Sequence, residues 1–310
     1  MELTVNDIAQ FKDLVYSRSH LSFPASRESQ LRRWITQRAL AGGYRSFDEY
    51  FRTLHASHAE FERLIALITT RETYFFRMPE QFEALGRVVL PAIVDREGKK
   101  AMKALSWKKP YRMQLRAWSA GCAMGQEAYS LSMQILDAIR YPKAWDIRVL
   151  GTDINAEALE IARAARYDST RLGKTPSPFI ERYFQVSGLE EITVAGAVRD
   201  ITTFQAVNLR NLPDLASLKN AFDIIFCRNV MIYFDLPAQQ RLISALWECL
   251  KPGGYLFTGE GEVLHLYDHA FTVKELGACI FYQKSEECAY VVKNDLAEGQ
   301  SGGTPTTAKS

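Results

Sequence analysis

The sequence has no long hydrophobic run and no leader-like beginning. No stretch approaches the roughly 18 consecutive apolar residues that a membrane-spanning helix needs. Residues 1–10 also lack the basic segment followed by an apolar core that marks a secretory signal. We therefore expect a cytoplasmic protein that does not insert into a membrane.

Cysteine is scarce, and its spacing is irregular. There are five cysteines and no C-x-x-C pair, so neither a disulfide framework nor a zinc site is expected: Cys122, Cys227, Cys249, Cys279 and Cys288. Reduced thiols are the simpler interpretation. The formal net charge is only +2, which gives no indication of a nucleic-acid partner. We expect no metal site and no nucleic-acid partner.

What is present is the composition of a soluble globular chain of 310 residues, with 47% hydrophobic and 24% charged residues. Apolar residues recur at helical spacing from Val5 to about Arg77, which predicts an N-terminal helical domain over residues 1–78. Its second predicted helix and the following turn are rich in arginine, which indicates either a solvated face or a docking surface for an acidic helical partner: Arg27, Arg32, Arg33, Arg38 and Arg45.

The segment after this domain is aromatic and then basic. Tyr74, Phe75 and Phe76 are adjacent and cannot all lie on one helical stripe, which favours a lid or pocket wall over a core helix. Residues 79–110 begin with Pro79 and an amphipathic stretch and continue into a segment rich in lysine and glycine. We assign residues 79–110 to a linker helix and a linker, with the linker itself at 95–110.

The stretch 115–133 organises the rest of the chain. A short apolar run passes through a glycine turn at 119–125 and then takes up helical spacing, which predicts strand, loop and helix. Gly121 and Gly125 let the backbone approach a nucleotide-like ligand. The spacing is G-x-x-x-G and not G-x-G-x-x-G, which favours an adenosine ligand over a dinucleotide. A tight structural turn is the alternative.

Two further strands end in polar residues. Residues 146–153 read as a short strand with Asp153 at its carboxyl end, where an acid commonly accepts hydrogen bonds from ribose hydroxyls, although a helix-capping or turn role is the alternative. The apolar run 222–227 is typical of a central buried strand and ends in Arg228 and Asn229. Ligands bind at this edge in open α/β sheets, so these residues are candidates for a site.

Between these strands the alternation of strand and helix breaks. Residues 167–207 carry prolines, glycines and period-two patterns at 183–186, 191–194 and 201–204, which predict an inserted antiparallel β-subdomain. Its exposed edge could pair with an extended peptide, or the insertion could be a plain structural lobe. We assign residues 111–292 to the sheet domain and residues 293–310 to a disordered tail.

Four motifs in this order resemble the CheR family, the chemotaxis receptor methyltransferases. They are T-T-R-E-T-Y-F-F-R at 69–77, W-S-A-G-C-A-M-G-Q-E-A-Y-S-L at 118–131, G-T-D-I at 151–154, and F-D-I-I-F-C-R-N-V-M-I-Y-F-D at 222–235. The resemblance covers roughly residues 7–292. It implies an all-α N-terminal domain, a Rossmann-like S-adenosylmethionine-dependent methyltransferase sheet and an inserted antiparallel β-subdomain.

The resemblance also implies an activity and site residues. The family forms glutamate methyl esters on the cytoplasmic domains of chemoreceptors (methyl-accepting chemotaxis proteins) and converts S-adenosyl-L-methionine into S-adenosyl-L-homocysteine. Carried over by motif, Arg77 and Tyr233 are the expected catalytic residues, with Tyr233 close to the reactive methyl group. Thr73 and Arg77 would contact the methionine end of the cofactor, and Asp153 the ribose. The expected cofactor-binding set is Arg71, Thr73, Arg77, Gly121, Glu127, Asp153, Asn208, Leu209, Arg228 and Asn229.

The sequence departs from the family pattern at two places. Arg71 stands where the family usually has Asn, and residues 259–262 read G-E-G-E where the family usually has G-H-S-E. Two alternatives are therefore kept: a receptor-binding adaptor with impaired catalysis, and a methyltransferase for another substrate, such as a small molecule or RNA. We expect a monomer.

Overall fold

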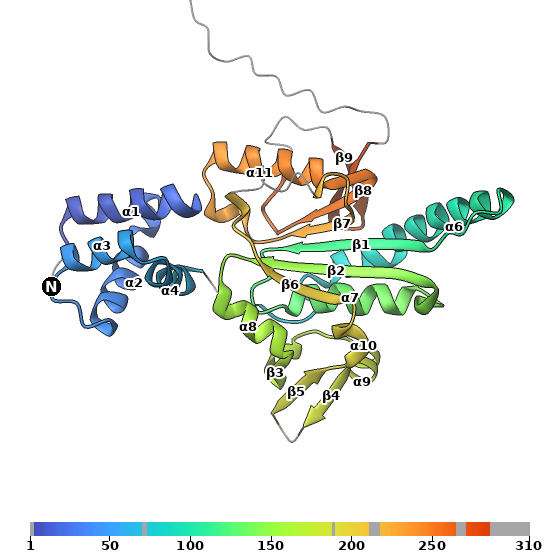
Figure 1. Ribbon diagram of the computed structural model, residues 1–310, viewed down its shortest axis with the longest axis horizontal. Coiled ribbons are helices and arrows are strands. Elements are labelled where there is room, and N and C mark those ends of the chain that lie inside the picture. Colours follow the sequence, from blue (N-terminus) through green and yellow to red (C-terminus); the bar gives the residue numbers. More distant parts are fainter. Residues whose placement is uncertain (1–2, 70–72, 188–189, 211–217, 265–270, 286–310) are drawn as a thin grey trace, which may run out of the picture.

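The computed structural model describes residues 3–69, 73–187, 190–210, 218–264 and 271–285. Four helices form the N-terminal lobe: α1 (Val5–Ser19), α2 (Glu28–Ala41), α3 (Phe47–Ala56) and α4 (His58–Ile68), with a 3-10 turn, η1 (Ala25–Arg27), before α2. A capping box starts α1, because Thr4 and Asp7 bond to each other's backbone amides. The lobe has its own apolar core, which includes Phe11, Leu31 and Tyr50. It lies to one side of the sheet domain (Figure 1).

The arginines of this lobe are largely engaged within the protein. Arg32 pairs with Glu28 at 2.9 Å, and Arg38 pairs with the buried Glu60 at 2.8 Å. The Arg27 guanidinium lies over the Tyr233 ring, 4.8 Å from its centroid. Three of the five arginines that suggested a docking surface therefore have intramolecular contacts.

The stretch between lobe and sheet is helical for most of its length. It comprises α5 (Pro79–Ala84), a π-helical turn, η2 (Leu85–Val89), and α6 (Leu90–Ser106). The linker expected at 95–110 is wrong in this respect, because α6 continues through residue 106. Phe75 and Phe76 belong to the core of the sheet domain, so the helical lobe ends before the expected boundary at residue 78.

A seven-stranded sheet forms the second domain, in the order β6-β2-β1-β7-β8-β10-β9. The strands are β1 (Met113–Ala120), β2 (Trp145–Asp153), β6 (Thr202–Ala206), β7 (Phe222–Cys227), β8 (Leu250–Thr258), β9 (Phe271–Leu276) and β10 (Cys279–Lys284). The five strands from β6 to β8 pair in parallel, and β10 runs antiparallel to both of its neighbours. This arrangement confirms the Rossmann-like sheet.

Helices cover both faces of this sheet (Figure 1). Successive residues of β7 alternate between the faces: Ile224 and Phe226 belong to the core that includes α7 (Gln126–Ala138), and Ile225 and Cys227 belong to the core that includes α11 (Leu236–Cys249). All six residues of β7 are buried, as expected of a central strand, and one of them is the charged Asp223. Asp235 caps α11 by accepting a hydrogen bond from the Ala238 amide at 2.9 Å.

The inserted subdomain is smaller than expected. It contains a three-stranded antiparallel sheet in the order β3-β5-β4, made by β3 (Arg166–Asp168), β4 (Phe184–Ser187) and β5 (Glu191–Val194). Helices α8 (Ala156–Ala164), α9 (Ser177–Tyr183) and α10 (Gly196–Arg199) and the 3-10 turn η4 (Ser169–Leu172) flank it along the chain. The assignment of 201–204 to this subdomain is wrong, because β6 pairs in parallel with β2. As an edge strand it is half-exposed, and this produces the same period-two pattern.

Several expectations concern residues that the structure does not describe. Arg71 and the predicted tail at 293–310 lie outside the described residues. Within the described ranges, no helix combines the length and apolar character needed to cross a bilayer. The same ranges hold no group of three or more His, Cys, Asp or Glu residues placed to bind a metal ion.

Candidate functional site

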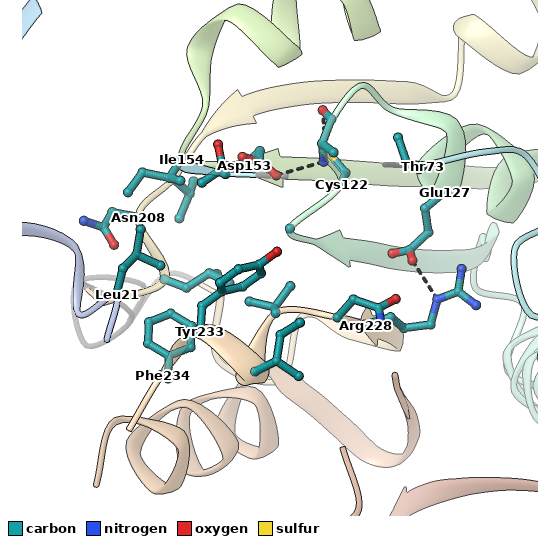
Figure 2. Close-up of a pocket in the computed structure, with 18 of the residues that line it drawn as sticks. Leu21, Thr73, Cys122, Glu127, Asp153, Ile154, Asn208, Arg228, Tyr233 and Phe234 are labelled. Carbon is teal, nitrogen blue, oxygen red and sulfur yellow. Dashed lines mark hydrogen bonds and ion pairs between the residues drawn. The ribbon is translucent and has the colours of Figure 1, made fainter. Parts of the chain in front are cut away.

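A cavity of about 330 Å³ lies at the carboxyl edge of the parallel strands, beside the N-terminal lobe. Every described residue of the predicted site lines it: Thr73, Arg77, Gly121, Glu127, Asp153, Asn208, Leu209, Arg228, Asn229 and Tyr233. Figure 2 shows Asp153, Glu127, Arg228 and Tyr233 around this space. Segments that are far apart in the sequence therefore meet at one concave site.

Asp153 is held at the end of β2 by backbone amides. Its two carboxylate oxygens accept hydrogen bonds from the Ala123 and Asn155 amides, each at 2.8 Å. Burial raises the pKa of Asp153, and these amides oppose the shift. Asn155, and not Asp153, caps α8 by accepting from the Ala158 amide at 3.1 Å. The helix-capping alternative for Asp153 is thus wrong, whereas its bond to the Asn155 amide two residues on is the contact of a turn residue. Asp153 also lines the cavity.

The glycine loop lies against the end of β2 because two consecutive amides, those of Gly121 and Cys122, donate to the Thr152 carbonyl at 2.8 Å. Gly121 has a φ of +84°, and a Cβ there would lie 2.3 Å from a methyl group of Val230. Ala123 also has a positive φ, +46°. Only glycine satisfies both the backbone angle and the space at position 121.

Glu127 and Arg228 form a buried ion pair at the base of the cavity, joined at 2.7 Å (Figure 2). The Ser119 hydroxyl donates to the other carboxylate oxygen of Glu127 at 2.7 Å. Arg228, 4% exposed, also donates to the Arg77 carbonyl at 2.7 Å and to the Gln81 side chain at 3.0 Å. One guanidinium therefore links three elements that meet at the site: α7, α5 and the end of β7.

The segment 73–77 reaches the cavity only through its ends. Thr73 and Arg77 line it, whereas Phe75 and Phe76 are buried in the sheet-domain core. Phe75 packs edge-to-face on Phe184 of the inserted subdomain, with centroids 4.8 Å apart. The expectation that the adjacent aromatics wall the pocket is wrong for these two residues, because both rings pack in the apolar core of the sheet domain.

Tyr233 stands on the loop between β7 and α11, in the 3-10 turn η6 (Met231–Tyr233). Its hydroxyl points into the cavity in Figure 2. The Tyr233 carbonyl accepts a hydrogen bond from the Ser22 amide at 2.7 Å, which fixes the loop to the N-terminal lobe. The Arg27 contact described above fixes the ring. The N-terminal lobe therefore sets the orientation of Tyr233.

Glu262 holds the loop between β7 and α11 in place through hydrogen bonds to backbone amides. Its carboxylate accepts hydrogen bonds from the amides of Asn229 at 2.7 Å, Gly259 at 2.7 Å and Ile232 at 3.2 Å. Burial raises the pKa of Glu262, and the hydrogen bonds from these amides act in the opposite direction. A Cβ at position 259 would lie 2.4 Å from the Glu262 carboxylate. The G-E-G-E segment therefore keeps the glycine and the glutamate of the G-H-S-E pattern, and those two residues make the contacts.

Asn208 contributes mainly to the junction between the two domains. Its side-chain amide donates to the Arg18 carbonyl at 2.8 Å, and its oxygen accepts from the Arg210 amide at 3.0 Å. The Asn155 side chain similarly donates to the Thr69 hydroxyl at 3.0 Å. These bonds bring the N-terminal lobe over the cavity.

Sequence reasoning missed half of the lining residues: Ser19, Leu21, Thr69, Cys122, Ala123, Ile154, Val207, Val230, Ile232 and Phe234. Most of them adjoin a predicted residue and could have been found by extending each motif by one or two positions. Ser19 and Leu21 come from the end of α1, where no chemical pattern in the sequence marks a site. Burial and the acids Asp153 and Glu127 raise the pKa of the Cys122 thiol.

A largely parallel sheet with an acid at the end of its second strand and a glycine loop at the end of its first is an arrangement in which α/β folds bind nucleotide-like ligands, and it is the one expected of an S-adenosylmethionine-dependent methyltransferase. The family described as CheR methyltransferase, SAM binding domain, matches residues 71–279, and the CheR methyltransferase all-alpha domain matches residues 6–69. The chain therefore belongs to the CheR methyltransferase family, and its cofactor is S-adenosylmethionine.

Similar proteins carry related names. Chemotaxis protein methyltransferase 2 of Vibrio cholerae is 29% identical over 91% of this chain and 94% of its own length. Chemotaxis protein methyltransferase 1 of Pseudomonas aeruginosa is 37% identical over 67% of this chain and 72% of its own. The probable biofilm formation methyltransferase WspC of Pseudomonas putida is 35% identical over 74% of this chain and 50% of its own. These relatives agree with the family assignment.

Proposed function

We propose that this enzyme methylates glutamate side chains on the cytoplasmic domains of chemoreceptors, forming methyl esters, with S-adenosylmethionine as the donor. The observation that carries the proposal is that ten residues of the predicted site, from five separate segments, line one cavity. The family and the names of the relatives support the same class of substrate. We further propose that the enzyme is a cytoplasmic monomer.

The cavity offers matching groups for the ribose and for the methionine end of the cofactor. We assign the ribose to Asp153, because an ionised carboxylate at the end of the second strand accepts hydrogen bonds from vicinal hydroxyls. Gly121 lets the backbone approach the nucleoside. Thr73, Arg77 and Glu127 are assigned to the methionine end, where the amino and carboxylate groups need partners of both charges. Leu209 and Asn229 complete the wall.

The chemistry requires no general base. A glutamate side chain has a pKa of about 4.3, so the acceptor is ionised at neutral pH. A carboxylate oxygen attacks the methyl carbon, the carbon–sulfur bond breaks, and the sulfur retains the bonding electrons, leaving neutral thioether in S-adenosylhomocysteine. Position and the removal of water from the carboxylate then set the rate. Arg77 and Tyr233 are assigned to orienting the two reactants.

The test is methyl incorporation from labelled S-adenosylmethionine into a panel of receptor cytoplasmic fragments from the same cell. The proposal expects label that base hydrolysis releases as methanol, and no label in fragments whose acceptor glutamates are replaced by alanine. Label that enters total RNA or small molecules, but no receptor fragment, would contradict the substrate.

Calorimetry with S-adenosylhomocysteine separates an enzyme from a receptor-binding adaptor. The proposal expects binding at micromolar concentrations, because Asp153 and the Glu127–Arg228 pair are in place and Glu262 holds the loop. An adaptor with a disabled site would bind receptor fragments and show no heat with S-adenosylhomocysteine at tens of micromolar.

A further inference from the structure

Helix α6 projects from the body of the enzyme. In Figure 1 its carboxyl-terminal half extends past the amino ends of β1 and β2, away from the N-terminal lobe. Its buried residues, Leu90, Ile93 and Glu97, all lie in its first half. Each residue from 98 to 106 is partly or fully exposed. We call residues 95–112 the α6 tip.

The α6 tip exposes large apolar side chains. Met102 is 72% exposed, Leu105 is 73% exposed and Trp107 is 60% exposed. Met102 and Leu105 are three residues apart, so they lie on one side of the helix. These are the large apolar side chains within residues 98–109, and all three are more than half exposed; grouped exposure of this kind marks a surface for contact.

Positive charge surrounds these apolar residues. The α6 tip holds seven lysines and arginines and two acids. Arg96 pairs with the buried Asp223, Lys99 with Asp95 and Lys100 with Glu97, so the charge next to the exposed apolar residues comes from Lys103, Lys108 and Lys109. The Nζ atoms of Lys103 and Lys109 lie 4.9 and 5.6 Å from the centroid of the Trp107 ring. Lysines therefore flank the exposed tryptophan on both sides. A partner for this surface has to be anionic and also able to accept aliphatic side chains.

We propose that the α6 tip docks on the surface of a bilayer that contains anionic phospholipids. Met102, Leu105 and Trp107 enter the headgroup region, and the lysines lie against the lipid phosphates. Basic helices that present tryptophan and leucine bind bilayer surfaces in this way. This is a peripheral contact and does not rest on the proposed methyl transfer.

The residue types favour lipid over a nucleic acid or an acidic protein. All five cations from Lys99 to Lys109 are lysines, whereas arginine supplies the planar fork that pairs bidentately with carboxylates and nucleic-acid phosphates. The one arginine after them, Arg112, donates to the Trp145 carbonyl at 2.9 Å. Lysines beside exposed Met, Leu and Trp match the surface of a bilayer, where lipid phosphates lie above the hydrocarbon chains.

The experiment is sedimentation of the full chain with vesicles of phosphatidylcholine, alone or mixed with phosphatidylglycerol. The structure predicts binding to the mixed vesicles that weakens as salt is raised. The triple variant Lys103→Gln/Lys108→Gln/Lys109→Gln is expected to weaken binding about 100-fold. The double variant Met102→Ser/Leu105→Ser tests the apolar contact. Arg33→Gln/Arg45→Gln/Lys174→Gln removes the same charge elsewhere and should leave binding unchanged.

Trp107 gives an independent readout on the same samples. Mixed vesicles should shift tryptophan emission to shorter wavelength in the wild type and not in Trp107→Phe. Loss of vesicle binding in the tip variants, with unchanged S-adenosylhomocysteine binding, supports the proposal. Absence of binding to mixed vesicles, equal binding by the tip and control variants, or tip-dependent binding only to an acidic receptor fragment or to RNA would overturn it.

Discussion

The main sheet carries two buried charge clusters, one at each end of β7, and they differ in what surrounds them. At the amino end, Asp223 is fully buried, accepts from the Lys251 ammonium at 2.7 Å and the Arg116 amide at 2.8 Å, and pairs with Arg96. At the carboxyl end, Arg228 pairs with Glu127 beside the cavity. The amino-end cluster holds α6, β1, β7 and β8 together, whereas the carboxyl-end cluster lines the cavity.

Backbone conformation does not separate the two clusters. Gly121, Ala123 and Asn229 near the carboxyl-end cluster have positive φ, and so do Asn220 and Gly253 near the amino-end cluster. The comparison teaches that neither a buried ion pair nor a left-handed residue alone marks a site in this fold, whereas an ion pair that lines a cavity does.

The largest effect is expected at the carboxyl end, in Arg77→Ala. If Arg77 orients the reactants as we propose, removing its guanidinium should lower the rate of methyl transfer by about 100-fold or more, while the melting temperature changes little. Arg87→Ala, which removes an exposed arginine paired with Glu83, is the matched control. Initial rates with a receptor fragment provide the measurement. Near-normal transfer by Arg77→Ala would contradict the assignment.

A substitution in the amino-end cluster should lower the stability of the protein and leave cofactor binding unchanged. Asp223→Asn leaves Arg96 and Lys251 without their counter-charge and should lower the free energy of unfolding by about 3 kcal/mol. Affinity of the folded variant for S-adenosylhomocysteine should be unchanged. Urea unfolding and calorimetry measure the two quantities.

Glu127→Gln is the matching change at the other end. Arg228 keeps its hydrogen bonds to the Arg77 carbonyl and to Gln81 in this variant, so the stability loss should be smaller, about 1 kcal/mol, and the cofactor affinity should fall instead. Equal stability losses and equal affinities in the two variants would remove the distinction between the clusters.

The pH dependence of cofactor binding gives a further test of the carboxyl-end site, because it depends on the ionisation of Asp153. Burial raises the pKa of Asp153 above its ordinary 3.8, and the ribose hydroxyls need the ionised carboxylate. A proton therefore competes with the cofactor, so affinity should fall on acidification at a higher pH than an ordinary aspartate would require. Asp153→Asn should lower affinity by about 2 kcal/mol, roughly 30-fold, and lose this pH dependence. An unchanged pH profile in the variant would argue against a ribose at Asp153.

The smallest effect is expected from a methyl group in the glycine loop. Gly121→Ala adds a Cβ 2.3 Å from Val230, and we expect about tenfold weaker cofactor binding, about 1.4 kcal/mol. Gly277→Ala is the control, because its φ is +58° and no atom lies within 4 Å of the added Cβ. Both variants place an alanine at a positive φ, but only the one at position 121 also meets a neighbouring side chain. A similar loss of affinity in Gly277→Ala would show that strain alone is responsible.

The central strands and their polar ends could be predicted from the sequence because each signal is local. The buried run of β7 and Asp153 at the end of β2 are visible in a few adjacent residues. Edge strands are less distinct: β6 has the alternation of a separate antiparallel sheet, and only its pairing with β2 corrects the assignment. A lysine-rich stretch that continues a helix into solvent, as in α6, likewise reads as a linker.

Contacts between distant segments could not be predicted. The Glu127–Arg228 pair joins residues about a hundred positions apart, and Ser19 and Leu21 reach the cavity from the first helix. The role of Glu262 could not be predicted, because Glu262 bonds to backbone amides of another loop and the pattern of side chains in the sequence does not indicate such bonds. The resemblance to a family placed the residues in one site, and the structure supplies the bonds that hold them.

A crystal structure with S-adenosylhomocysteine bound tests the central claim most directly. The account predicts the ribose hydroxyls on the Asp153 carboxylate, the amino-acid end near Thr73 and Arg77, and the sulfur facing the Tyr233 hydroxyl. A ligand bound elsewhere, or one in this cavity with its ribose away from Asp153, would contradict the account.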